Sequence, residues 1–260
     1  GHSLSLSSDG TTVCYGQLQS DMSGQVNVYK YLSLPRLYYS PSKSWQQLGE
    51  TLYNKPKSTA HNIVANSYVY DVDNFGLGNS ISADGMRIAI GGYNTDKDSA
   101  ATKEDSKGYV KVYDYIDSSW VQIGGTIYGE YPGDEGGRNI ILTADGSRLA
   151  VATIQDRTVQ YNNNNPNPDH ALYYNRSGYV KVYDYIDSSW VQVGNTLKNS
   201  DVDRVFGSVQ FRFGEHMSLS RDGRRLAVGA PNDQNADFSN FSSQNVGRNT
   251  GQVRVYEYND

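Results

Sequence analysis

The chain has 260 residues, of which 37% are hydrophobic and 20% charged, and its formal net charge is −5. This weakly acidic balance, with Lys and Arg spread along the chain, argues against a nucleic-acid or anionic-membrane surface. No apolar run approaches the roughly 18 residues of a membrane span. Tyrosine is abundant, with 22 copies, and 26 glycines supply turns, so the composition is typical of short strands joined by polar loops.

One segment, GYVKVYDYIDSSWVQ, occurs twice without change, at 108–122 and at 178–192. Self-similarity at a fixed spacing indicates one supersecondary unit that is used several times. Weaker copies divide the chain into four units, at about 1–74, 75–135, 136–205 and 206–260. Each unit predicts short antiparallel strands in a fixed order, which we call strands a, b, c and d.

Strands a and b form the start of each unit. Strand a is a serine-rich apolar piece ending in Asp-Gly, and its copies end at Gly10, Gly85, Gly146 and Gly223. Asp-Gly between two apolar runs predicts a tight hairpin, because the turn needs positive φ. Strand b follows as TTVCYG, MRIAIGG, SRLAVAT or RRLAVGAP, short apolar runs that predict burial on both faces. The single cysteine, Cys14, is expected to be a small buried hydrophobe there.

Strands c and d complete the unit. Strand c begins at Gly24, Gly108, Gly178 and Gly251, and its alternating valines predict a half-exposed strand. Strand d surrounds Trp45, Trp120 and Trp190. We expect these tryptophans to form the core between neighbouring units rather than a ligand platform.

Repeated sheets of this kind cannot bury a face alone and must stack on one another. The sequence therefore predicts an all-β single domain, 1–260, that forms a β-propeller of about four four-stranded antiparallel blades. A solenoid-like stack is the alternative. Helix content is expected to be close to nil.

Three motifs resemble the FG-GAP repeats of integrin-α-type β-propellers, over all four units. They are Phe75-Gly76 and Phe213-Gly214 before strand a, Gly229-Ala230-Pro231 closing strand b, and Gly-x-Val-x-Val-Tyr in strand c. The resemblance implies a propeller fold and an extracellular adhesion or interaction domain. Many FG-GAP units bind calcium through Asp-x-Asp-x-Asp-Gly, whereas each Asp-Gly loop here has a single acid. We therefore predict no calcium, no other metal and no cofactor.

The last unit is expected to lack its outer strand d within the chain. This leaves an assembly edge along strand c that holds Gly251, Val253, Val255, Tyr256 and Tyr258. Three outcomes stay open: a three-stranded blade, an insertion that folds back, or a strand from another copy. The candidate donor segments, at 67–72 and 208–213, hold Tyr68, Tyr70, Val72, Val209 and Phe211.

The sequence contains no catalytic signature. The four histidines form no zinc-like pair, and there is no Gly-x-Ser-x-Gly elbow, phosphate loop or dinucleotide fingerprint. We therefore predict that the chain is not an enzyme and has no catalytic residues. Asn175 and Asn240 lie in sequons and are candidate glycosylation sites of a secreted chain.

These patterns favour a non-catalytic, secreted structural or adhesion propeller. Its copies would assemble head-to-tail into filaments by completing the last blade. The expected partners are other copies of the chain, with glycans or extracellular proteins as further partners, and no nucleic acid or membrane insertion. The alternative is a lectin-like carbohydrate- or protein-binding module, whose loops would use Tyr93, Asn94, Asp96, Asn232 and Asp233.

Overall fold

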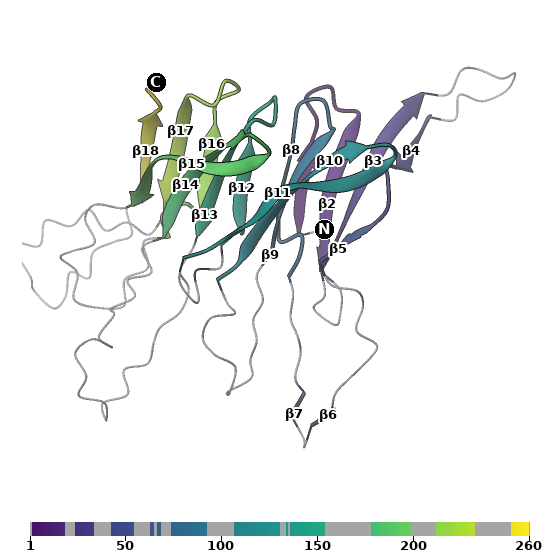
Figure 1. The fold of residues 1–260 in the computed structure, drawn as a ribbon, viewed down its shortest axis with the longest axis horizontal. Coiled ribbons are helices and arrows are strands. Elements are labelled where there is room, and N and C mark those ends of the chain that lie inside the picture. The colour runs from purple at the N-terminus through teal and green to yellow at the C-terminus, as the bar shows by residue number, and fades with distance from the viewer. Residues whose placement is uncertain are drawn as a thin grey trace, which may run out of the picture.

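The computed structural model describes residues 2–18, 24–33, 43–54, 63–64, 67–68, 74–92, 107–130, 134, 136–153, 178–198, 212–231 and 251–259. Their regular structure is strand throughout, so the described residues contain no helix that could cross a membrane. Four antiparallel sheets stand side by side as the four blades of a β-propeller (Figure 1). The prediction of an all-β fold with four repeated sheets is confirmed.

The strands follow the predicted order in every blade. Blade 1 contains β1 (Ser3–Leu6), β2 (Thr12–Leu18), β3 (Gly24–Ser33) and β4 (Lys43–Gln47), with β5 (Leu52–Tyr53) also paired to β3. Blade 2 contains β8 (Gly78–Ile81), β9 (Arg87–Gly92), β10 (Tyr109–Ile116) and β11 (Ser119–Tyr128). Blade 3 contains β12 (Asn139–Leu142), β13 (Arg148–Thr153), β14 (Tyr179–Ile186) and β15 (Ser189–Lys198). Blade 4 contains β16 (His216–Leu219), β17 (Arg225–Ala230) and β18 (Gln252–Glu257).

The Asp-Gly turns between strands a and b have a common geometry. Gly10 has a φ of +71°, and the equivalent glycines lie within a few degrees of it. The Asp9 carboxylate accepts hydrogen bonds from Ser7 Oγ, at 2.6 Å, and from the Thr11 amide, at 2.9 Å. These hydrogen bonds lower the pKa of Asp9 to about 2, and the bond from Ser7 has the largest effect. The Ser or Thr two residues before each turn aspartate makes the same bond, so the motif stabilises its own hairpin.

Each blade packs face to face on the next, and this packing forms the core. Three clusters lie between successive blades, and strand c is buried in them more deeply than predicted. In β10, Val110 is 1% exposed, Val112 is 0% and Tyr113, on the opposite face, is 8%. The prediction of a half-exposed strand is therefore wrong for blade 2, because neighbouring blades cover both of its faces. Cys14 is fully buried, as expected, and burial raises the pKa of its thiol to about 12.

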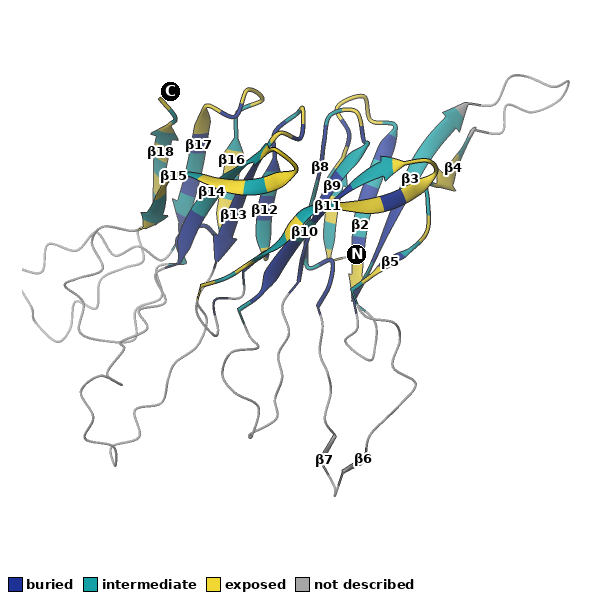
Figure 2. Cartoon of the chain, in the orientation of Figure 1, coloured by how far each residue is buried: buried dark blue, intermediate teal, exposed yellow. Residues whose placement is uncertain are grey.

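Blades 1 and 4 lie at opposite ends of the row (Figure 1). Each is packed on one face only. Exposed residues alternate with partly buried ones along β18 of blade 4, and β4 of blade 1 is largely exposed (Figure 2). The position of a tryptophan in this row decides its burial. Trp120 of blade 2 is 5% exposed and Trp190 of blade 3 is half-buried, but Trp45 of blade 1 is 46% exposed. The core prediction is thus wrong for Trp45, because no described blade precedes it.

Blade 4 has three strands within the described residues, and β18 is its outer strand. Of the candidate donor residues, only Tyr68 lies in the described part of the chain. It belongs to β7 (Ser67–Tyr68), which pairs with β6 (Ile63–Val64), and so it does not complete blade 4. Tyr70, Val72, Val209 and Phe211 lie outside the described residues.

Candidate functional site

Polar side chains gather at both ends of the blades. One end holds the turns between strands a and b, and we call it the turn end. The other end, where strands b finish and strands c begin, is the loop end, because the long connections from strand b to strand c of one blade, such as 154–177 between β13 and β14, start and finish there. The two ends differ in chemistry.

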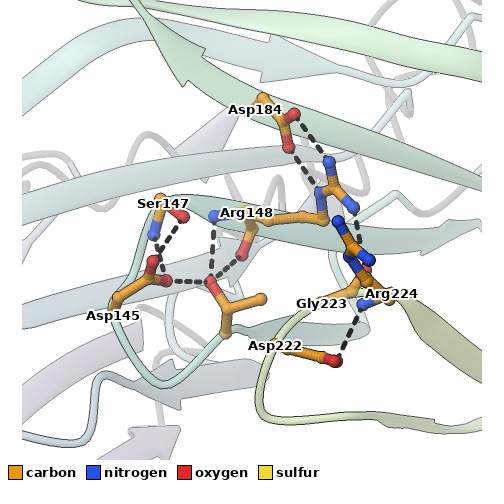
Figure 3. Close-up of polar contacts among 8 residues, drawn as sticks. Asp145, Ser147, Arg148, Asp184, Asp222, Gly223 and Arg224 are labelled. Atoms are coloured by element: carbon orange, nitrogen blue, oxygen red, sulfur yellow. Dashed lines mark hydrogen bonds and ion pairs between the residues drawn. The ribbon is translucent and has the colours of Figure 1, made fainter. Parts of the chain in front are cut away.

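At the turn end, an arginine joins each of two blades to the next. Arg148 Nε and Nη2 donate to the two carboxylate oxygens of Asp184, at 2.6 and 2.8 Å. Its Nη1 donates to the Gly223 carbonyl of blade 4, at 2.8 Å (Figure 3). Its guanidinium also lies 4.1 Å from the ring centroid of Tyr258. The bidentate pair holds the arginine rigid, so that it can bind the next turn.

The same arrangement occurs one blade earlier. Arg87 binds Asp114 in the same bidentate way, at 2.6 and 2.8 Å, donates to the Gly146 carbonyl at 2.9 Å and lies 4.9 Å from the Tyr185 ring. The arginine of the later joint borders an open cleft of about 250 Å³ between blades 3 and 4. Its guanidinium nitrogens are already bonded to the protein, so we assign the turn end a structural role.

At the loop end, four side chains come together between blades 2 and 3. Tyr179 Oη donates to Oδ2 of Asp134 at 2.5 Å, and the Asp134 side chain is fully buried. The same phenol oxygen accepts the backbone N–H of Glu130, at 3.1 Å. Glu130 in turn forms an ion pair with Lys181. Strand β14 thus supplies a phenol and an ammonium group, while the segment after β11 supplies two carboxylates.

The environment favours the neutral phenol. Burial raises the pKa of Tyr179 well above its ordinary value, and the hydrogen bond to Asp134 is the second-largest cause of this rise. Lys181 Nζ lies 5.6 Å from the centroid of the same ring. A pocket of about 10 Å³, close to the minimum for one water molecule, is lined by Tyr179, Lys181 and Thr153. The cluster therefore combines a proton donor, a carboxylate acceptor and a positive charge beside a water-sized pocket.

The sequence pattern does not single out this cluster, because Tyr179 and Lys181 belong to the repeated segment of strand c. The acid-rich segment EYPGDE at 130–135, which supplies Glu130 and Asp134, is the one signal that points to it. Among groups that the sequence did select, the edge residues Val253 and Val255 are 70% and 68% exposed on β18. The sequons at Asn175 and Asn240 lie outside the described residues, as do the proposed ligand residues Tyr93, Asn94, Asp96, Asn232 and Asp233.

No group of three or more potential metal ligands occurs among the described side chains. No family model matches the chain, and no curated protein matches it in sequence. Some solved structures of distant sequence are similar to it. A protein from Bacteroides uniformis that is assigned as a 6-phosphogluconolactonase is 12% identical, with a TM-score of 0.43, over 99% of this chain and 67% of its own.

Two further similar structures have named activities. The periplasmic gluconolactonase of Pseudomonas aeruginosa is 14% identical over 87% of this chain and 64% of its own, with a TM-score of 0.37. An oligogalacturonate lyase in complex with manganese is 10% identical over 87% of this chain and 61% of its own, with a TM-score of 0.34. The chain thus spans less than two thirds of the length of these two proteins.

This finding corrects the functional prediction. We expected a non-catalytic structural or adhesion propeller, with a lectin-like module as the alternative, but the similar structures named above are enzymes. The expectation that the chain is no enzyme is weakened for the same reason. At identities of 10–14%, these structures carry no activity and no substrate over to this chain.

Proposed function

We propose that the chain is a propeller hydrolase that uses the Asp134–Tyr179 pair to activate water. One observation carries the proposal: a fully buried carboxylate accepts a hydrogen bond from a phenol that lines a pocket of the size of one water molecule. Clusters of buried titratable groups that line a pocket are typical of acid–base sites.

The proposed chemistry is the addition of water to a carbonyl group. As the water oxygen attacks the carbonyl carbon, its proton passes to Tyr179 Oη, and the phenol proton passes to Asp134. The ammonium of Lys181 favours the negative charge that develops on the carbonyl oxygen. When the ester or lactone bond breaks, the leaving oxygen takes a proton back from Tyr179, and Asp134 returns its own.

The test is a hydrolysis assay with simple esters and sugar lactones, including gluconolactone and 6-phosphogluconolactone. Tyr179→Phe removes the proton donor and Asp134→Asn removes the acceptor, and each should lower kcat about 10²- to 10⁴-fold. Thermal unfolding of each variant separates this loss from misfolding.

The repeat supplies a matched control. Tyr109 is the equivalent of Tyr179 in blade 2, where its ring stacks on Phe75. Tyr109→Phe should therefore leave kcat unchanged. Wild-type protein that hydrolyses none of the substrates, or equal losses in Tyr109→Phe and Tyr179→Phe, would contradict the proposal.

A further inference from the structure

The three joints between blades are built from two kinds of face. We call the face that packs on the next blade the trailing face, and the face that packs on the previous blade the leading face. The trailing faces of blades 1, 2 and 3 present two valines of strand c, namely Val26 and Val28, Val110 and Val112, and Val180 and Val182. The leading faces present apolar residues of strands a and b, such as Ile140 and Leu142 in blade 3.

Polar contacts reinforce two of these joints. The arginine that begins strand b, on the trailing face, donates to the carbonyl of the turn glycine on the next leading face. This occurs from Arg87 to Gly146 and from Arg148 to Gly223. The arginine also lies over a tyrosine of that next blade. The turn glycine is buried at these joints because the arginine covers it.

The trailing face of blade 4 has the same pattern but is uncovered. Val253 and Val255 occupy the positions of Val110 and Val112, yet they are 70% and 68% exposed instead of 1% and 0%. Arg225 occupies the position of the joint arginines, and Glu257 holds it at 3.2 Å in an exposed ion pair. All the elements of a trailing face are therefore present.

The leading face of blade 1 is uncovered in the complementary way. Leu4 and Leu6 correspond to Ile140 and Leu142, but they are 72% and 56% exposed instead of 4% and 6%. Its turn glycine, Gly10, is exposed, and no atom lies within 4 Å of the position that a Cβ would take there. At the internal joints the equivalent position is filled: Gly85 meets Thr12, Gly146 meets Arg87, and Gly223 meets Thr143 and Arg148.

We propose that the trailing face of blade 4 docks on the leading face of blade 1 of a second copy. Val253 and Val255 would then cover Leu4 and Leu6, and Arg225 would reach the Gly10 carbonyl. The two faces carry complementary residue patterns, and a second copy of these 260 residues presents both, so it is the occupant that we infer. Two copies satisfy all four end faces, and the result is a closed dimeric ring of eight blades.

Sedimentation and light scattering over a range of concentrations test this proposal. A dimer of twice 28.8 kDa should form. Val255→Asp and Leu6→Asp place a charge in the joint, and each should raise the dissociation constant about tenfold or more. Val121→Asp is the matched control, because Val121 is 45% exposed on β11, away from both end faces. It should dimerise as the wild type does.

Cross-linking identifies the occupant. A Leu6→Cys/Val255→Cys double variant, treated with a short bismaleimide, should give a product of doubled mass, since the native Cys14 is buried. A cross-linked product of single mass would mean that the chain closes on itself, which would overturn the proposal. A wild-type protein that stays monomeric at all concentrations, or that forms only species larger than a dimer, would overturn it as well.

Discussion

The two identical segments, 108–122 in blade 2 and 178–192 in blade 3, fold alike but have different surroundings. Their hairpins match closely, with φ of +47° at both Asp117 and Asp187. At the loop end, however, Lys111 bonds to the neutral amide of Asn54, whereas Lys181 pairs with the carboxylate of Glu130. The identical sequence therefore gives the same backbone conformation twice, while the preceding blade supplies the polar partner of each lysine.

The tryptophans of the two segments should give the largest difference in stability. Trp120 is 5% exposed and its Nε1 donates to the Leu48 carbonyl at 2.8 Å. Trp190 is half-buried, and its Nε1 has no hydrogen-bond partner in the described part of the chain. We expect Trp120→Ala to lower the free energy of unfolding by about 3–5 kcal/mol and Trp190→Ala by roughly half as much. Urea unfolding measures both free energies. Equal losses would mean that packing on the preceding blade does not set the contribution of each tryptophan to stability.

The aspartates of the segments should behave alike, because both hold a joint arginine in the same geometry. Asp114→Asn and Asp184→Asn should each lower the free energy of unfolding by about 1–3 kcal/mol. At concentrations where the chain is monomeric, Glu257→Gln, at the equivalent position in blade 4, should cost at most about 0.5 kcal/mol, because its ion pair is exposed there. The three urea-unfolding midpoints test this order, and a Glu257 effect as large as the others would contradict it.

The smallest expected effect on stability is that of pH on the Asp-Gly turn of blade 1. The pKa of Asp9 is about 2 in the folded protein, below the value of about 3.9 for an unfolded aspartate. The unfolded chain therefore binds more protons between these values, and the stability from Asp9 is present above about pH 4 and lost as the pH falls toward 2. Asp9→Asn should flatten the decline of the urea midpoint over this interval. An unchanged decline would mean that the Asp9 hydrogen bonds do not contribute.

The periodicity of the chain was enough to predict the strands and the blade order. Asp-Gly turns and the alternating Val-x-Val pattern depend on contacts a few residues apart, and these contacts are the same in every blade. The candidate site could not be predicted in this way. Asp134 and Tyr179 are 45 residues apart, and the acid-rich segment before Gly136 has no counterpart in the other units.

The sequence by itself determined the repeat, the hairpins and the apolar faces of the strands, because local backbone preferences and side-chain alternation act within each unit. Only the tertiary structure decided which of those faces are covered, since burial depends on the next blade rather than on the residue. It placed the same Val-x-Val pair in the core of blade 2 and on the open face of blade 4. It likewise brought a buried carboxylate to one tyrosine of the repeated segment, at the joint between blades 2 and 3.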